Sequence, residues 1–188
     1  MIHIPDTKVV RQQSIDWARR LLQQEFYILD SETTGLDEHG EIVQIAVINH
    51  HGLTIADTFV KPSVDINEKG RAYEVSGISN RMVRDAPRFG EVWDIIYPTV
   101  RNQQIVAYNA TYDLRMVKQS CVKNGPSKHY PFDEKAWIDA MIPYSEFVGD
   151  WNDYYGNFRW QRLPGTQHGA LSDCIAVLDL LNMMAKSE

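Results

Sequence analysis

The sequence predicts an α/β domain built on a mixed β-sheet with flanking α-helices. Two apolar segments early in the chain are joined by a His-His-Gly turn, which predicts an antiparallel hairpin. Further along, strand-like and helix-like segments alternate, which is typical of parallel strands connected by helices. The chain has 188 residues, of which 44% are hydrophobic and 23% charged, and this size and composition suit one globular domain.

The first elements follow from the spacing of apolar residues and from turn residues. Apolar residues recur at helical spacing over residues 14–24, and Ser14 is the expected N-cap. A continuous apolar run predicts a buried strand over residues 26–30. Residues 41–49 and 53–60 are the two predicted strands of the hairpin.

The middle of the chain is predicted to be largely helical. Residues 79–84 begin with a capping serine and predict a short helix, and residues 89–100 predict a longer one that Pro98 must bend or end. Residues 104–108 are a short predicted strand. It leads directly into a predicted helix over residues 110–123.

Two elements complete the pattern. Residues 137–139 are one more predicted strand, and residues 170–186 are a closing helix with a continuous apolar face. Neither an internal repeat nor a linker interrupts the chain. We therefore expect a single domain over residues 25–188, with residues 1–24 as a helical extension packed on it.

Composition excludes several classes of protein. No apolar run approaches the roughly 20 residues that span a bilayer, and no secretory signal is expected at the start. Two cysteines outside any metal-binding pattern favour a reducing, cytoplasmic location. The net charge of −6 argues only weakly against a nucleic-acid partner, because carboxylates gathered around divalent cations also make a protein acidic.

A pair of acidic residues follows the first predicted strand. Residues two apart on a strand point to the same face, roughly 6–7 Å apart, so Asp30 and Glu32 would direct two carboxylates at one spot. A divalent cation with oxygen ligands would relieve their repulsion. Two solvated acids at the end of a strand are the alternative interpretation.

Two further segments place chemically useful residues near helix starts. Asp113 falls in the first turn of the predicted helix 110–123, where the helix dipole alone would also stabilise an acid. His168 precedes the closing helix, on a loop with a glycine on each side, and Asp173 lies about one turn into that helix. Histidine is suited to accept a proton near neutral pH. A surface histidine with a capping acid is the alternative.

The three segments together carry a resemblance to a known family. Residues 30–36 match the pattern Asp-x-Glu-Thr-Thr-Gly-Leu, and residues 168–173 match His-x-Ala-x-x-Asp. Residues 109–113 correspond to the pattern Asn-Ala-x-Phe-Asp, with Tyr112 in place of the phenylalanine. The chain thus resembles the DEDDh-type 3′–5′ exonucleases, the DnaQ-like family that includes polymerase proofreading subunits and RNase T. The resemblance covers residues 25–186. It implies a ribonuclease H-like fold, with a five-stranded mixed sheet flanked by helices.

The resemblance also implies a site and a mechanism. The implied catalytic residues are Asp30, Glu32, Asp113, His168 and Asp173. The four carboxylates would hold two divalent metal ions, Mg²⁺ with Mn²⁺ able to substitute, and His168 would be the general base. The implied substrate contacts are Thr33, Thr34, Leu36 and Asn109.

The implied activity is metal-dependent hydrolysis of single-stranded DNA from a free 3′ end, releasing nucleoside 5′-monophosphates. The same residues suit trimming of RNA 3′ ends, and a non-catalytic module that binds nucleic acid or a polymerase is a third reading. The implied partners are single-stranded nucleic acid and a DNA polymerase, with no membrane. An aromatic segment over residues 151–164 is expected either to stack on bases or to pack as an irregular layer over the sheet.

Overall fold

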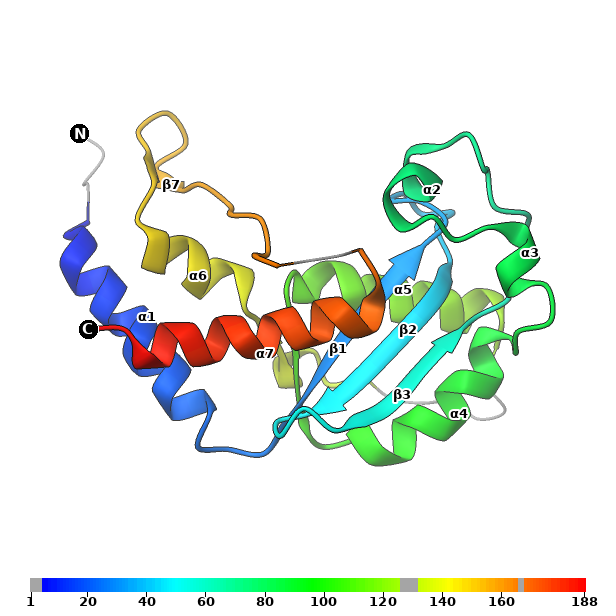
Figure 1. The fold of residues 1–188 in the computed structure, drawn as a ribbon, viewed down its shortest axis with the longest axis horizontal. Coiled ribbons are helices and arrows are strands. Elements are labelled where there is room, and N and C mark those ends of the chain that lie inside the picture. Colours follow the sequence, from blue (N-terminus) through cyan, green and yellow to red (C-terminus); the bar gives the residue numbers. More distant parts are fainter. Residues whose placement is uncertain (1–4, 126–131, 166–167) are drawn as a thin grey trace.

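A five-stranded mixed sheet is the centre of the computed structural model, which describes residues 5–125, 132–165 and 168–188 (Figure 1). The strand order is β3-β2-β1-β4-β5. The strands are β1 (Phe26–Thr33), β2 (Ile42–Asn49), β3 (Thr54–Phe59), β4 (Gln104–Ala107) and β5 (Trp137–Asp139). The predicted mixed α/β architecture, with its hairpin and its later strands, is confirmed.

The pairing of the strands determines where the site can form. β1, β2 and β3 are antiparallel neighbours, whereas β4 runs parallel to β1 and β5 runs parallel to β4. The carboxyl ends of β1, β4 and β5 therefore meet at one edge of the sheet. In open α/β sheets this edge is where ligands usually bind.

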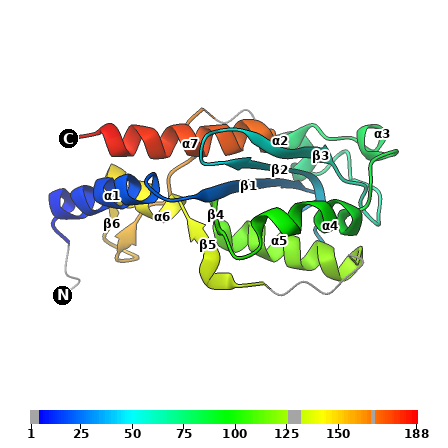
Figure 2. The same cartoon turned by 90° about the horizontal axis from the view of Figure 1, so that it is seen from below.

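Helices cover both faces of the sheet, with α7 on one face and α4 and α5 on the other (Figure 2). The helices are α1 (Thr7–Leu21), α2 (Arg71–Ser76), α3 (Asn80–Val83), α4 (Phe89–Val100), α5 (Ala110–Lys123), α6 (Met141–Val148) and α7 (Ala170–Lys186). A 3-10 turn, Glu134–Ala136, precedes β5. Among the described residues, no helix combines the length and apolar character needed to cross a bilayer.

Each face of the sheet has its own core because side chains alternate along a strand. Ile28 packs toward α7, in a cluster that includes the buried Cys174. Leu29 packs toward α4 and α5 against Trp93 and Met116. Continuing this alternation along β1 directs residues 30 and 32 toward the α7 side and residues 31 and 33 toward the α5 side.

The first helix starts earlier than the sequence pattern predicted. Asp6 is its N-cap, and the Asp6 Oδ1 atom accepts hydrogen bonds from the amides of Lys8 and Val9, at 3.0 and 3.4 Å. The predicted N-cap, Ser14, lies inside the helix, where its hydroxyl donates to the Val10 carbonyl at 3.1 Å. A start at Ser14 is therefore wrong. α1 packs against α6 and α7 (Figure 1).

The predicted helix over residues 89–100 is confirmed as α4, and Pro98 lies inside it near its C-terminal end. One other expectation needs correction. The aromatic segment does not lie as an irregular layer over the sheet, since it forms a small hairpin of β6 (Trp151–Asn152) and β7 (Asn157–Phe158) that borders a pocket together with α1 and α6. Tyr154, Tyr155 and Trp160 of this segment are exposed. Base stacking by these residues remains a prediction.

Candidate active site

Three carboxylates from two elements converge at the edge of the sheet. Asp30 and Glu32 come from β1, and Asp173 comes from the first turn of α7. Ligand oxygens of the three residues all lie within 4.8 Å of one another, and each residue is half-buried. The strand geometry explains the first pair, and the packing of α7 on the same face of the sheet brings in the third.

The carboxylates of this cluster are destabilised by burial and by one another. Burial raises the pKa of Asp30 well above its usual value, and the charges of Asp113, Asp173 and Glu32 raise it further. Burial and Asp173 also raise the pKa of Glu32. Repelling carboxylates with only oxygen ligands fit a hard divalent cation, which would favour their ionised forms.

A fourth carboxylate, Asp113, is buried on the α5 side of the site. It lies in the first turn of α5 and accepts a 2.7 Å hydrogen bond from the Ser31 hydroxyl on β1. Burial raises the pKa of Asp113 to about 7, although the hydrogen bond from Ser31 opposes the rise. Ser31, which lies between Asp30 and Glu32 on β1, is therefore the residue through which this strand contacts Asp113.

His168 stands at the entrance to the site. It is exposed, and its backbone adopts the left-handed region with φ of 57° just before α7 begins. Its proximity lowers the pKa of Glu32, opposing the effects of burial and of Asp173. The structure thus brings all five predicted catalytic residues to one edge of the sheet.

Asp139 at the end of β5 is an acid that the sequence pattern did not single out. Its two carboxylate oxygens accept hydrogen bonds from the backbone amides of Ala110, at 3.1 Å, and Met141, at 2.8 Å. It therefore anchors the first residues of α5 and α6, and its charge adds to those that raise the pKa of Asp113. The signal was present, because Asp139 follows an apolar strand just as Asp30 does.

A pocket of about 490 Å³ opens beside the carboxylates. Glu32, Thr33, Thr34 and Leu36 line it from β1 and the loop that follows, and residues of α2 close the other side. Leu36 is 73% exposed, so its apolar side chain is available for contact. Asn109, the fourth predicted substrate contact, is the N-cap residue of α5 and is not part of this lining.

The two threonines are held by the protein itself. The Thr33 hydroxyl lies 2.6 Å from the hydroxyl of Tyr112 and donates to the Gly35 carbonyl at 3.1 Å. Thr34 closes the base of the loop, because its hydroxyl accepts a 3.0 Å hydrogen bond from the Glu41 amide. These contacts fix the backbone that lines the pocket.

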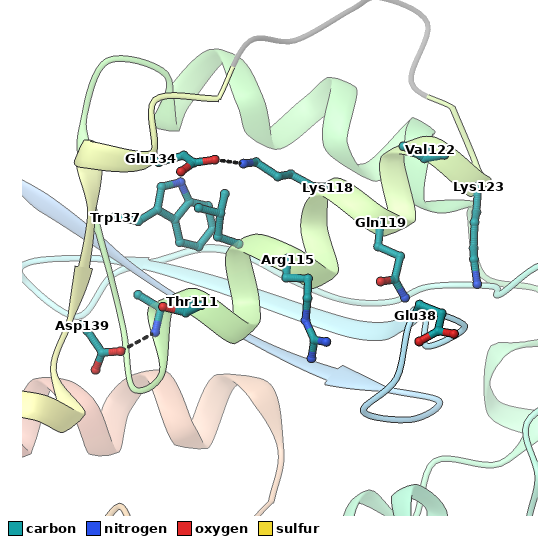
Figure 3. A pocket seen from close by; sticks show the side chains of 12 residues that line it. Glu38, Thr111, Arg115, Lys118, Gln119, Val122, Lys123, Glu134, Trp137 and Asp139 are labelled. Atoms are coloured by element: carbon teal, nitrogen blue, oxygen red, sulfur yellow. Dashed lines mark hydrogen bonds and ion pairs between the residues drawn. The ribbon is translucent and has the colours of Figure 1, made fainter. Parts of the chain in front are cut away.

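A larger pocket, of about 700 Å³, lies on the outer side of α5 (Figure 3). It borders Asp139 at one end and the tip of the loop after β1 at the other. None of the four clustered carboxylates lines it. The smaller pocket, by contrast, includes Glu32 of the carboxylate cluster in its lining.

Comparison with known proteins identifies the family. The family model RNase_T, described as exonuclease, matches residues 27–181. The chain belongs to this exonuclease family. The uncharacterized exonuclease CP81 of Escherichia phage 186 is 30% identical over 183 residues, which are 90% of this chain and 92% of the phage protein.

Similar segments occur both within a much longer protein and in a protein of comparable length. A PolC-type DNA polymerase III from Caldanaerobacter subterraneus is 33% identical over 55% of this chain, but the match spans 8% of the polymerase. Exonuclease X, solved with 5′-overhanging duplex DNA, is 26% identical with a TM-score of 0.52, covering 86% of this chain and 92% of that one.

The fold extends to more distant structures. Escherichia coli exonuclease I, solved in complex with single-stranded DNA, has a TM-score of 0.62 at 17% identity, covering 84% of this chain and 39% of that chain. The predicted resemblance to DnaQ-like exonucleases and the predicted ribonuclease H-like fold are both confirmed.

Proposed function

We propose that this protein is a 3′–5′ exonuclease that hydrolyses single-stranded DNA to nucleoside 5′-monophosphates. The observation that carries the proposal is the convergence of Asp30, Glu32 and Asp173 within 4.8 Å, with the buried Asp113 beside them and His168 at the entrance. A binding module has no physical need for clustered, repelling carboxylates, whereas phosphodiester hydrolysis assisted by cations does.

The donor set suits two divalent cations. Asp30, Glu32 and Asp173 would hold the first, while Asp113, together with Asp30, would hold the second. When bound, such a pair of cations stabilises the charge on the attacking and the leaving oxygens of an in-line displacement. Mg²⁺ suits these oxygen ligands, and Mn²⁺ is able to replace it.

His168 is the proposed general base. Its exposed position next to Glu32 allows it to take a proton from the attacking water. The oxygen of that water then bonds to the terminal phosphorus and the bond from phosphorus to the 3′ oxygen breaks. The products are a nucleoside 5′-monophosphate and a strand shortened by one nucleotide, whose 3′ oxygen takes up a proton.

The pocket beside the carboxylates is the proposed place for the terminal nucleotide. It is lined by Thr33, Thr34 and the exposed Leu36, and Glu32 of the cluster also lines it. A duplex end must lose a base pair before its last nucleotide can enter, which costs a few kcal/mol. Single strands are therefore the preferred substrate, as the complex of exonuclease I with single-stranded DNA also suggests.

Two further proposals concern partners and location. Segments similar to this chain occur within PolC-type polymerases, so we propose a DNA polymerase as a partner, to be tested by co-purification. The free cysteines Cys121 and Cys174 fit a reducing compartment, and we propose the cytoplasm.

Degradation of labelled oligonucleotides tests the proposed activity. Linear DNA and RNA strands of one sequence, each labelled at the 5′ end, are incubated with the protein and Mg²⁺ or Mn²⁺. We expect a ladder that shortens from the 3′ end of the DNA and release of 5′-monophosphates. Circular single-stranded DNA, which offers no end, is the control and should resist.

Each contrary result has a distinct meaning. Efficient cleavage of circles would indicate an endonuclease, and faster loss of RNA would indicate an exoribonuclease. If neither strand is shortened with either cation, the proposed activity is refuted, and a shift in mobility of the intact strand would then test the non-catalytic binding module.

A further inference from the structure

A row of polar side chains on α5 faces the loop between β1 and β2. Arg115, Gln119 and Lys123 are spaced four residues apart, so they lie on one face of the helix. Figure 3 shows the three side chains extending toward the loop that carries Glu38. This loop follows Asp30 and Glu32 directly and carries Leu36.

Each of the three side chains donates to backbone carbonyls of the loop. Arg115 Nη2 donates to the Leu36 carbonyl at 2.9 Å, and Lys123 Nζ donates to the His39 carbonyl at 2.6 Å. Gln119 Nε2 donates to two carbonyls, those of Asp37, at 3.2 Å, and Gly40. One face of α5 thus holds the loop along its length. The bonds go to backbone carbonyl oxygens, so they do not depend on the identity of the loop's side chains.

The loop is also closed tightly at its base. A Cβ atom on Gly40 would lie 2.3 Å from the carbonyl oxygen of Gly35, so only glycine fits there. The Arg115 guanidinium lies 5.4 Å from the centre of the Tyr112 ring, and the Tyr112 hydroxyl contacts Thr33. Arg115 therefore contacts the Leu36 end of the segment that lines the proposed nucleotide pocket directly, and the Thr33 end only through Tyr112.

The cationic groups beside α5 are already used by the protein. Lys118 pairs with Glu134, while Arg115 and Lys123 bind the loop. The acidic side chains of Glu38 and Asp139 also line the larger pocket on the outer side of α5. These contacts indicate that Arg115, Gln119 and Lys123, here called the clamp, hold the loop in place and do not form a phosphate-binding surface.

We propose that Arg115, Gln119 and Lys123 are positioning residues that hold Leu36 against the terminal nucleotide. This proposal rests on the proposed exonuclease function. An exposed apolar side chain on an unsupported loop would lose conformational freedom each time it contacted a substrate. Three donors on a rigid helix remove that freedom in advance, so the clamp lowers KM without touching the reacting atoms.

A double-mutant cycle tests whether Arg115 acts through Leu36. Arg115→Ala removes one charge-assisted hydrogen bond and should raise KM for single-stranded DNA about tenfold, with kcat changed less than about twofold. Leu36→Ala should raise KM similarly. In the Leu36→Ala background, adding Arg115→Ala should change KM by less than about twofold, because the shared contact is already lost.

Two controls separate the clamp from general destabilisation. Lys118→Ala, on the same helix, removes a side chain that pairs with Glu134 instead of the loop and should leave KM unchanged. Hydrogen exchange of the amides in residues 35–40 should accelerate in Arg115→Ala but not in Lys118→Ala. The Mn²⁺ dissociation constant should be the same in all variants.

Three results would overturn the proposal. The first is full additivity of the two substitutions in KM, and the second is unchanged amide exchange in Arg115→Ala. The third is a wild-type protein that degrades no nucleic acid, in which case the proposed function fails and the clamp fails with it. An active wild type with an unaffected Arg115→Ala variant would refute the clamp alone.

Discussion

The Ser31 hydroxyl donates a 2.7 Å hydrogen bond to Oδ1 of Asp113, and both residues are buried. Ser31 lies between Asp30 and Glu32 in sequence but points to the opposite side of β1. The central strand thereby supplies two carboxylates on one face and orients a third from the other. In the motif Asp-x-Glu of this chain, the middle residue is part of the site.

Replacing Ser31 tests this role. Ser31→Ala removes the hydrogen bond that opposes the effect of burial, so the pKa of Asp113 should rise further. The Mg²⁺ concentration for half-maximal rate should then increase by about three- to tenfold at neutral pH, the size of a single lost hydrogen bond. Rate measurements over a Mg²⁺ titration provide the test. A lower maximal rate with an unchanged midpoint would contradict it.

The metal-free protein should become less stable as the pH rises. Acids with lowered pKa values in the folded state have the opposite effect. Burial raises the pKa of Asp30, Glu32 and Asp113 in the folded state, to about 7 for Asp113, above the value of about 4 expected unfolded. The contribution of these three groups to the free energy of unfolding is thus fully present below about pH 4, and it is lost as the pH rises through their folded-state pKa values.

Thermal unfolding in chelator should therefore show a lower Tm at pH 8 than at pH 6. Saturating Mg²⁺ should reduce this difference, because bound cations favour the ionised carboxylates. Asp113→Asn should also reduce it, since it removes a group that loses its proton in this range. A Tm that rises from pH 6 to pH 8 in chelator would contradict the prediction.

Asp30 should be needed for activity and costly for stability. Asp30→Asn removes one of four repelling charges, so the chelated variant should have a higher Tm than wild type at pH 8. Its rate should fall below about a tenth of the wild-type rate, because a ligand proposed to bridge both cations is lost. Asp65→Asn, at an exposed acid away from the cluster, is the control and should change neither quantity.

His168→Ala should separate proton transfer from metal binding. The rate should fall by roughly 10²–10⁴-fold, the usual contribution of a positioned general base. Calorimetric Mn²⁺ binding should be unchanged, since the proposed ligands are all carboxylates. Added imidazole should restore part of the rate. A variant that loses metal binding instead would make His168 a ligand.

Metal removal should abolish activity reversibly. The clustered donors are carboxylate oxygens, which suit hard cations, so a chelator should stop hydrolysis and Mg²⁺ or Mn²⁺ should restore it. The measurement is the rate before and after adding excess cation to the chelated protein. Full turnover in excess chelator would refute the proposed mechanism.

Local sequence patterns were sufficient to predict much of this molecule. Spacing on a strand placed Asp30 and Glu32 on one face, and the start of a helix placed Asp173 in its first turn. These are properties of single elements. The helices α5 and α7 also begin and end at the predicted residues, because their apolar faces are long and regular.

Features that depend on contacts between distant segments could not be predicted in this way. The hydrogen bond from Ser31 to Asp113 joins residues 82 positions apart, and the contacts of Arg115 with the loop join residues 79 apart. α2 was missed because none of its residues is buried, so it has no apolar face to detect. The start of α1 was misplaced because Asp6, the residue that caps it, precedes its apolar pattern.

The buried thiol of Cys174 is a native probe of the packing of α7 against the sheet. The thiol contacts the carbonyls of Ile28 and Ala46 on the sheet, at 3.7 and 3.5 Å, so a reagent reaches it only when α7 lifts away. Asp173 is the preceding residue, so a displacement of this turn of α7 that exposed the sulfur would also move this carboxylate relative to Asp30. The labelling rate of Cys174, resolved from that of the half-buried Cys121, would therefore measure opening of the protein at α7, next to Asp173.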